Sequence, residues 1–353
     1  MKQVKVITAQ EAALLVKDND VVASNGFVGS VQPEALTSAL EARFLETGTP
    51  RDLTLIYAAS QGNSDGRGGD HFAHEGMLKK AILGHWNAVT ALQKLVNANK
   101  IQAYNLPQGT LAQYFRDVAA HRVGTITHVG LETFADPRVS GGRLNDVTTE
   151  DFVKVIQIDG KDQLFYPRMD INVALIRGTY ADEWGNVVLT KEIAPLDATS
   201  IAQAAHNSGG TVIVQVEKIV KGGMLDPKLV KVPGIYVDYV VEAPETKFCE
   251  QTFDCEYNAA LTGELTVPLH ALAPVPLNAK KIIARRASLL LLDLSSEAII
   301  NLGIGIPEFI ASVANEEGIG DSLTMTVEAG AVGGVPLGGV RFGASVNAEA
   351  ILD

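Results

Sequence analysis

The chain has 353 residues, of which 46% are hydrophobic and 20% charged, and its net charge is −12. This acidic balance argues against a nucleic-acid surface, because phosphate backbones are bound by clusters of Lys and Arg that we do not find in the sequence. The longest apolar stretches fall well short of the ~20 residues that cross a bilayer, and residues 1–13 lack a signal-peptide core, so we expect a cytoplasmic protein with no membrane role.

The length exceeds that of one ordinary compact core and predicts two domains. The 33 glycines lie scattered between apolar and amphipathic runs, which is typical of an α/β enzyme. Cys249 and Cys255 are the only cysteines, and their spacing suits neither a disulfide framework nor a zinc site.

Apolar runs alternate with amphipathic stretches through the first 242 residues, which predicts mainly parallel sheets with helices on both faces. The clearest strand predictions are 21–27, 53–60, 101–106, 171–178 and 211–220, and the clearest helix predictions are 33–45 and 109–121. Residues 1–242 are therefore predicted to form the first domain.

The pattern lapses between 243 and 278, where Pro244, Pro268, Pro274 and Pro276 punctuate the chain. We expect the interdomain linker in this stretch. A second α/β domain is predicted over 279–353, beginning with a helix that runs to Leu294.

Residues 21–36 and 298–310 share one pattern, in which an apolar strand, an asparagine and glycines precede Pro-Glu and an amphipathic helix. Pro33 and Pro307 both stand where a first helical turn accepts proline. The pattern predicts two related halves, each with a glycine loop at the carboxyl end of a strand, where open α/β sheets bind ligands. Chance recurrence of these short motifs is the alternative.

Residues 323–327 read as a buried strand that ends at Glu328, which is followed by Gly330, Gly333 and Gly334. A carboxylate at a strand end beside a backbone without side chains can be approached closely by a bulky ligand. A solvent-facing glutamate in a surface loop explains the same spacing equally well.

The segment 327–334, VEAGAVGG, resembles the E-x-G-x-x-G-G segment of class I coenzyme A transferases, in particular the single-chain acetate or propionate type. Similar segments follow the family in order along the chain: 25–36, 70–86, 105–117 and 341–353. The resemblance thus spans nearly the whole sequence.

The resemblance implies a role for each matching residue. Glu328 corresponds to the nucleophile, and the side-chain amide of Gln108 to a group that holds the substrate or stabilises its oxyanion. The acyl site matches Asn25, Gly26, Phe27 and Gly29, and the CoA site matches Asn301, Gly303, Gly305, Gly333 and Gly334.

The implied reaction moves CoA between a short-chain acyl-CoA and acetate, propionate, lactate or a similar acid, through acyl-glutamyl anhydride and glutamyl-CoA thioester intermediates. CoA thioester is then a substrate, no cofactor or metal is bound permanently, and the nucleophile must be shielded from water. A homo-oligomer is expected by analogy. Three alternatives remain open: a 3-oxoacid CoA-transferase, an acyl-CoA hydrolase, and a ligand-sensing or isomerase protein on a related scaffold.

Two further expectations concern segments outside these motifs. His71, His74 and His85 lack ligands at convincing spacing, so 70–86 is interpreted as a packed surface helix rather than a metal site. The chain stops at Asp353, soon after Glu328, whereas members of the resembling family continue further. We therefore expect an incomplete second domain, completed by a separate C-terminal fragment.

Overall fold

The computed structural model describes residues 3–294, 297–320 and 323–352. The chain divides into two compact units. Unit 1 comprises 1–26, 32–189 and 197–249, and unit 2 comprises 27–31, 190–196 and 250–353. The domain boundaries proposed after residues 242 and 278 stay a prediction, because compact packing does not test independent folding.

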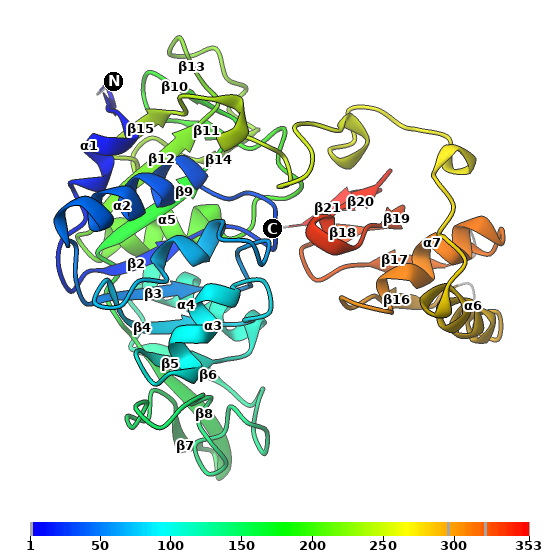
Figure 1. Cartoon of the computed structure of the whole chain (residues 1–353), viewed down its shortest axis with the longest axis horizontal. Coiled ribbons are helices and arrows are strands. Elements are labelled where there is room, and N and C mark those ends of the chain that lie inside the picture. Colours follow the sequence, from blue (N-terminus) through cyan, green and yellow to red (C-terminus); the bar gives the residue numbers. More distant parts are fainter. Residues whose placement is uncertain (1–2, 295–296, 321–322, 353) are drawn as a thin grey trace. The chain divides into compact units, whose positions relative to one another are not determined.

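Unit 1 is built on an eight-stranded sheet in which every neighbouring pair of strands is parallel (Figure 1). In spatial order the strands are β1 (Lys5–Val6), β15 (Tyr239–Glu242), β12 (Thr211–Val216), β9 (Val173–Arg177), β2 (Val21–Ser24), β3 (Leu53–Tyr57), β4 (Leu78–Leu83) and β5 (Gln102–Asn105). The predicted α/β class with a large, mainly parallel sheet is confirmed.

Helices cover both faces of this sheet. Successive residues of a strand point to opposite faces, so a strand with consecutive apolar residues presents apolar side chains to both groups of helices. Leu175 packs into the core under one group of helices, and the next residue, Ile176, packs into the core under the other. The first face carries α1 (Ala9–Ala13), α2 (Glu34–Thr47) and α3 (Thr90–Asn97), and the second α4 (Gln108–Ala119) and α5 (Ala198–Asn207). Each fully buried Leu or Ile stabilises this sandwich by about 1.5–3 kcal/mol.

Two smaller sheets and two 3₁₀ helices complete unit 1. One sheet has the order β13 (Lys218–Val220), β10 (Tyr180–Asp182), β11 (Val187–Val188) and β14 (Val230–Val232), and the other β6 (Gly124–Thr127), β8 (Lys161–Pro167) and β7 (Lys154–Ile158). The 3₁₀ helices are η1 (Gly68–Phe72) and η2 (Thr246–Phe248).

The interpretation of residues 70–86 as a surface helix is wrong. Residues 78–83 form β4, an inner strand of the sheet, and only η1 before it is helical. Residues Leu78–Leu83 mix lysines with apolar residues, and this pattern is also typical of an amphipathic helix. In the fold its apolar ends lie in the core while Lys79 remains exposed.

Unit 2 contains short strands and two main helices. Its elements are η3 (Ala259–Leu261), η4 (Leu269–Ala271), α6 (Ala279–Leu291), β16 (Ile299–Asn301), α7 (Glu308–Glu316), β17 (Thr324–Thr326), β18 (Ala331–Val332), β19 (Val335–Pro336), η6 (Gly339–Arg341), β20 (Ser345–Val346) and β21 (Ala350–Ile351). One sheet runs β16–β17–β18–β21, with the first pair parallel and the rest antiparallel, and β19 pairs with β20. Its small core includes Leu302, Ala314 and Met325.

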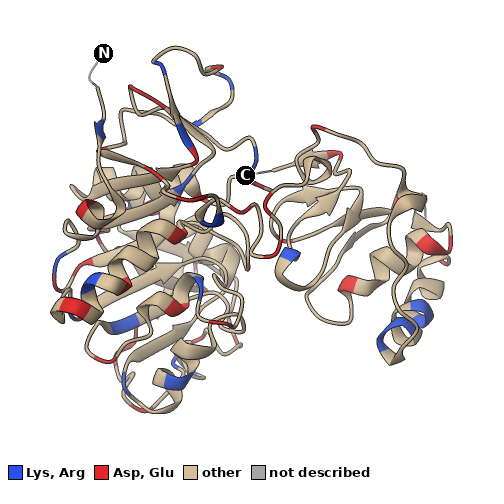
Figure 2. Ribbon diagram, turned by 45° about the horizontal axis from the view of Figure 1, so that its top comes forward, with Lys and Arg blue, Asp and Glu red and all other residues tan. Residues whose placement is uncertain are grey.

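Helix α6 differs from its sequence prediction in length and charge. It ends at Leu291 rather than Leu294, and Asp293 beyond it would oppose the negative carboxyl end of a longer helix. The helix also contains several basic residues close together, although the net charge of the whole chain is negative. Lys281 and Arg285 form ion pairs with Glu316 and Glu317 of α7, and elsewhere acidic and basic residues are interspersed (Figure 2).

Both copies of the internal sequence pattern form the same local structure. In unit 1, β2 leads through a glycine loop to Pro33 and α2; in unit 2, β16 leads through a glycine loop to Pro307 and α7. In each case the first strand pairs in parallel with the next strand along the chain, β3 or β17. Among the residues that the structure describes, no helix combines the length and apolarity needed to cross a bilayer.

Candidate active site

The central sheet of unit 1 changes direction between β2 and β9. From β2 the chain proceeds outward through β3, β4 and β5, whereas β9, β12 and β15 extend to the other side. In open α/β sheets such a switch point leaves a crevice at the carboxyl ends of the two strands. The site predicted from sequence begins here, because Asn25 directly follows β2.

Asn25 joins the two diverging strand ends through its side chain. Its Oδ1 accepts a hydrogen bond from the backbone N–H of Arg177 at 2.9 Å, and its Nδ2 donates to the Arg177 carbonyl at 3.5 Å. Asn25 is buried, so these bonds satisfy an amide that would otherwise cost free energy. The next residue, Gly26, has φ +143° and leaves room for the amide of Gln32, 2.6 Å from where a Cβ would lie.

Gln108 occupies the corresponding end of β5, three strands away. It is the first residue of α4, directly after Pro107, and its side chain is half-buried. Gly84 at the end of β4 lets this segment approach, because a Cβ there would lie 3.0 Å from the Gln108 Cα. Asn25 and Gln108 thus follow the carboxyl ends of two strands that are separated by β3 and β4 in the sheet.

The remaining acyl-site candidates, Phe27 and Gly29, belong to unit 2. The Phe27 ring stacks on Phe342 with ring centroids 5.9 Å apart, and the Gly29 carbonyl accepts a hydrogen bond from the Phe253 N–H at 3.0 Å. A side chain at position 343 would collide with the Phe27 ring, so Gly343 permits this packing. The structure therefore divides the predicted acyl-site residues between the two units.

The loop that carries these residues holds two strained valines. Val28 has φ +49° and Val31 has φ +58°, a left-handed conformation that β-branched residues rarely adopt. Both side chains are buried. Such outliers persist only where surrounding packing enforces them, and they are concentrated at functional sites. No pattern in the sequence indicates this strain.

Glu328 lies in the tight turn that follows β17. The turn closes through hydrogen bonds from Gly330 N–H to the Val327 carbonyl at 3.1 Å and from Val327 N–H to the Ala331 carbonyl at 3.1 Å. The flanking residues, Val327 and Ala329, are buried, and the Glu328 side chain points outward. In the described part of the chain no hydrogen bond or ion pair restrains its carboxylate.

The shielding of Glu328 from water stays a prediction. Its side chain is exposed, yet nearby protein still removes enough hydration to raise the pKa of Glu328 above its ordinary value. Solvent around the exposed side chain limits the size of this pKa shift. Phe27 lies close to the turn, because a Cβ at Gly343 would lie 2.7 Å from the Phe27 ring and 3.0 Å from the Ala329 methyl group.

The CoA-site candidates form two glycine segments in unit 2. Asn301 ends β16 and donates from Nδ2 to the Thr326 hydroxyl at 3.1 Å, which joins the ends of β16 and β17. Gly303 and Gly305 follow in an exposed loop, and no atom lies within 4 Å of where a Cβ would stand at either position. This loop can approach a bulky ligand closely.

The other glycine segment has a structural explanation. Gly333 and Gly334 connect β18 to β19 with φ values of +76° and +69°. The Gly333 N–H donates to the Met325 carbonyl at 2.7 Å, and the Gly333 carbonyl accepts from the Ser345 hydroxyl at 2.7 Å. This turn lies within unit 2 together with Glu328, and its role in binding CoA stays a prediction.

Sequence reasoning missed a buried charged cluster in unit 1. His71 donates from Nε2 to Glu34 at 2.9 Å and from Nδ1 to Glu41 at 2.6 Å, and Glu41 also binds His74 Nε2 at 2.6 Å. Arg67 Nε donates to Glu34 at 3.1 Å. Glu34 and Glu41 are seven residues apart on α2 and so share a face. That spacing was the one signal available in the sequence.

The cluster holds His71 in its charged form. Burial by itself lowers the pKa of His71, but hydrogen bonds and charge from Glu34 and Glu41 outweigh burial and raise the pKa to about 9. Burial likewise raises the pKa of Glu34 and Glu41, and their histidine and arginine partners reverse this and lower both pKa values. Both ring N–H groups of the His71 imidazolium thus donate to carboxylates.

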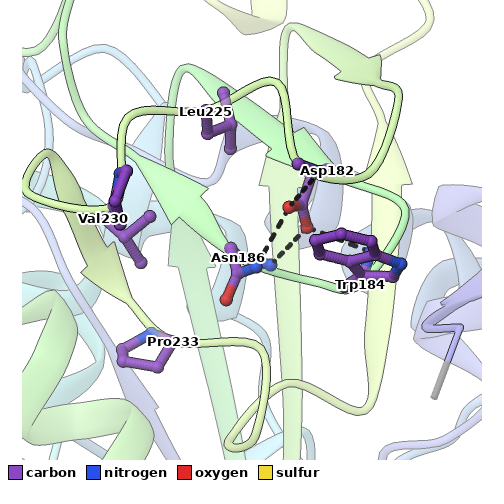
Figure 3. A pocket seen from close by; sticks show the side chains of 8 residues that line it. Asp182, Trp184, Asn186, Leu225, Val230 and Pro233 are labelled. Carbon is purple, nitrogen blue, oxygen red and sulfur yellow. Dashed lines mark hydrogen bonds between the residues drawn. The ribbon is translucent and has the colours of Figure 1, made fainter. Parts of the chain in front are cut away.

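A separate cavity of about 460 Å³ lies beside the small sheet β13–β10–β11–β14 (Figure 3). At one side the Asp182 carboxylate accepts hydrogen bonds from the backbone N–H groups of Trp184 at 3.0 Å and Asn186 at 2.9 Å, and from the Asn186 amide at 3.0 Å. Apolar groups such as Leu225 and Val230 form other walls. None of the site residues predicted from sequence lines this cavity.

Residues 6–243 match the family described as Coenzyme A transferase. Because this match covers well over half of the chain, the protein belongs to the coenzyme A transferase family, which confirms the resemblance seen in the sequence. Glu328 lies outside the matched residues.

Individual relatives extend the likeness over 99% of this chain. The caffeate CoA-transferase of Acetobacterium woodii is 42% identical over 349 residues, and the acetate CoA-transferase YdiF of Escherichia coli K12 is 40% identical over 352 residues. The chain spans 66% and 65% of their respective lengths, which is just under two thirds. The separate C-terminal fragment and the homo-oligomer stay predictions.

Solved structures agree with the fold. The acyl-CoA transferase YdiF of Escherichia coli O157:H7, in a thioester complex with CoA, matches with a TM-score of 0.90 and 39% identity over 99% of this chain and 68% of that chain. Glutaconate coenzyme A-transferase of Acidaminococcus fermentans matches with a TM-score of 0.56 and 22% identity over 70% of this chain and 78% of its own, which supports the fold alone.

Proposed function

We propose that this protein transfers CoA between a short-chain acyl-CoA and a carboxylic acid such as acetate, propionate or lactate, with Glu328 as the nucleophile. The observation that carries the proposal is the position of Glu328: it lies in the turn that follows β17, no described group binds its carboxylate, and glycines follow it. Membership of the coenzyme A transferase family supports this reaction class. The relatives named acetate and caffeate CoA-transferases support a carboxylic acid as the acceptor.

The chemistry suits a free carboxylate. Glu328 attacks the thioester carbonyl, the carbon–sulfur bond breaks, and an acyl-glutamyl anhydride forms with release of CoA thiolate. A thiol with a pKa near ~8.5 is a tolerable leaving group. The thiolate then attacks the glutamyl carbonyl, which gives a glutamyl-CoA thioester and releases the first acid as its carboxylate. A second carboxylate reverses both steps.

The absence of described partners is an advantage for this nucleophile. A carboxylate that accepts strong hydrogen bonds is stabilised as the anion and becomes a poorer nucleophile, whereas the raised pKa of Glu328 indicates an anion that is less stabilised than in water. Each tetrahedral intermediate carries negative oxygen, and one preorganised donor is worth about 2.7–4 kcal/mol. Gln108 and backbone N–H groups of the glycine loops are the proposed donors.

Intact mass spectrometry tests the proposal on the protein expressed from its complete reading frame. After addition of acetyl-CoA or propionyl-CoA we expect a covalent adduct of the mass of CoA less water, mapped to Glu328 and absent from Glu328→Ala. Ping-pong kinetics should accompany it. Glu349→Gln, another exposed glutamate of unit 2, serves as the matched control. Turnover without any adduct at Glu328 would refute the covalent mechanism.

A further inference from the structure

The two copies of the internal sequence pattern share a residue whose role the proposed reaction does not explain. In each copy a glutamate directly follows the proline at the start of the helix: Glu34 begins α2 and Glu308 begins α7. Neither glutamate was predicted as a site residue. Both carboxylates accept hydrogen bonds from backbone N–H groups of glycines outside their own helices.

In unit 2, Glu308 joins two glycine segments. Its Oε2 accepts from the Gly305 N–H at 3.1 Å and from the Gly339 N–H at 3.4 Å. Gly305 belongs to the loop between β16 and α7, whereas Gly339 lies 31 residues beyond Glu308, where η6 begins. The bond to Gly339 shows that Glu308 is more than a local cap of its own helix.

The close approach depends on Gly338. A Cβ at this position would lie 2.4 Å from the Glu308 carboxyl carbon, so a side chain here would displace the Glu308 carboxylate from its present position. Gly305 and Gly339 have φ values of +97° and +64°, conformations that cost other residues free energy. Glycine loops lose much entropy on ordering, and an acceptor shared by two of them offsets part of that loss.

In unit 1, Glu34 at the start of α2 binds a single glycine segment, the one that contains Gly68. Its Oε2 accepts from the Gly68 N–H at 3.1 Å, and its Oε1 accepts from Arg67 Nε at 3.1 Å and His71 Nε2 at 2.9 Å. The glycine loop 66–70 is thereby attached to the end of the loop that carries Asn25 and Gly26. The charged groups that face Glu34 are those of Arg67 and His71, with Glu41 behind His71.

We propose that Glu34 and Glu308 are paired positioning residues, one in each unit, that fix the start of the helix after the first glycine loop to a distant glycine segment. A carboxylate suits this task because its hydrogen bonds are charge-assisted, and because the first turn of a helix favours negative charge. The catalytic consequence rests on the proposed function, since these loops are the predicted acyl and CoA sites. The structural consequence does not.

Hydrogen-exchange mass spectrometry tests the structural part on the protein expressed from its complete reading frame. In Glu308→Ala we expect exchange in the peptides that span 303–307 and 337–341 to accelerate by about tenfold or more, with a smaller change in Glu308→Gln. Glu317→Gln, at the other end of α7, is the matched control and should leave both peptides unchanged. In Glu34→Gln the peptide that spans 66–70 should respond, whereas Glu46→Gln on α2 should not alter it.

Steady-state kinetics test the catalytic part. Glu308→Gln should raise KM for acyl-CoA by about tenfold while kcat changes less, because the lost interaction orders a binding loop rather than the reacting atoms. Unchanged exchange in both unit 2 peptides of Glu308→Ala would overturn the proposal, even if activity fell. If Glu308→Ala does not fold, the same criterion applies to Glu308→Gln. If exchange accelerates in Glu308→Ala while the wild-type protein itself shows no transferase activity, the positioning role is supported and the proposed function is refuted.

Discussion

Glu34 and Glu328 are both glutamates at a junction between a glycine segment and a regular element, yet their surroundings are opposite. Glu34 is buried and accepts hydrogen bonds from Arg67, His71 and the Gly68 N–H, and its pKa is lowered. Glu328 is exposed, no described group binds it, and burial of its surroundings raises its pKa. The contrast teaches that partners, rather than residue type, separate a structural carboxylate from one available for chemistry.

Replacement of Glu328 by Gln is expected to have the largest effect on activity and a negligible effect on stability. Loss of the nucleophile should lower the rate of CoA transfer on the order of 10³-fold or more, measured with acetyl-CoA and propionate. The free energy of unfolding, measured by urea denaturation, should stay within about 0.5 kcal/mol of the wild type, since no described interaction is lost. Full activity in Glu328→Gln would show that Glu328 is not the nucleophile.

Glu34→Gln, in contrast, should have a large effect on stability. Glu34→Gln removes the carboxylate that binds Arg67 and one of the two carboxylates that bind His71, and we expect the free energy of unfolding to fall by about 3 kcal/mol. Urea denaturation followed by circular dichroism measures this. Glu46→Gln on the same helix is exposed and should change the free energy of unfolding by less than about 0.5 kcal/mol. Equal effects of the two variants would contradict the cluster.

The pH dependence of stability should isolate His71. Its pKa is about 9 in the folded protein against 6.5 for the ordinary imidazole, so its contribution of about 3 kcal/mol is complete below pH 6.5 and is lost as pH rises toward 9. The lowered pKa values of Glu34 and Glu41 act oppositely: their contribution is present above pH 4.5 and is lost as pH falls further. Denaturation at pH 6 and pH 9.5 measures the difference, which should shrink in His71→Gln.

The smallest effect should come from an ion pair on the surface. Arg341 binds Asp254 at 2.9 Å in unit 2, but both side chains are more than a third exposed. Water and salt screen such a pair, so Arg341→Gln should lower the free energy of unfolding by less than about 0.5 kcal/mol, and less still in 0.5 M NaCl. A loss as large as that of Glu34→Gln would mean that burial does not determine how much an ion pair contributes to the free energy of unfolding.

Much of the fold and part of the site followed from local sequence pattern. Alternating apolar runs indicated a parallel sheet covered on both faces, and the repeated strand, glycine loop and Pro-Glu helix start formed in both units. Glu328 was located at its strand end by a change from apolar residues to glycines. These features depend on backbone preferences within a few residues, which a sequence displays directly.

Only the tertiary structure decided which distant groups meet. Asn25 bridges to Arg177, 152 residues away, because the strand order places β2 beside β9. Residues 70–86 were predicted as a helix from their sequence pattern, but 78–83 form strand β4 of the sheet. Phe27 belongs to unit 2, where its ring stacks on Phe342. Such contacts depend on how elements pack over long separations, and the free energy of that packing has no local signature in the chain.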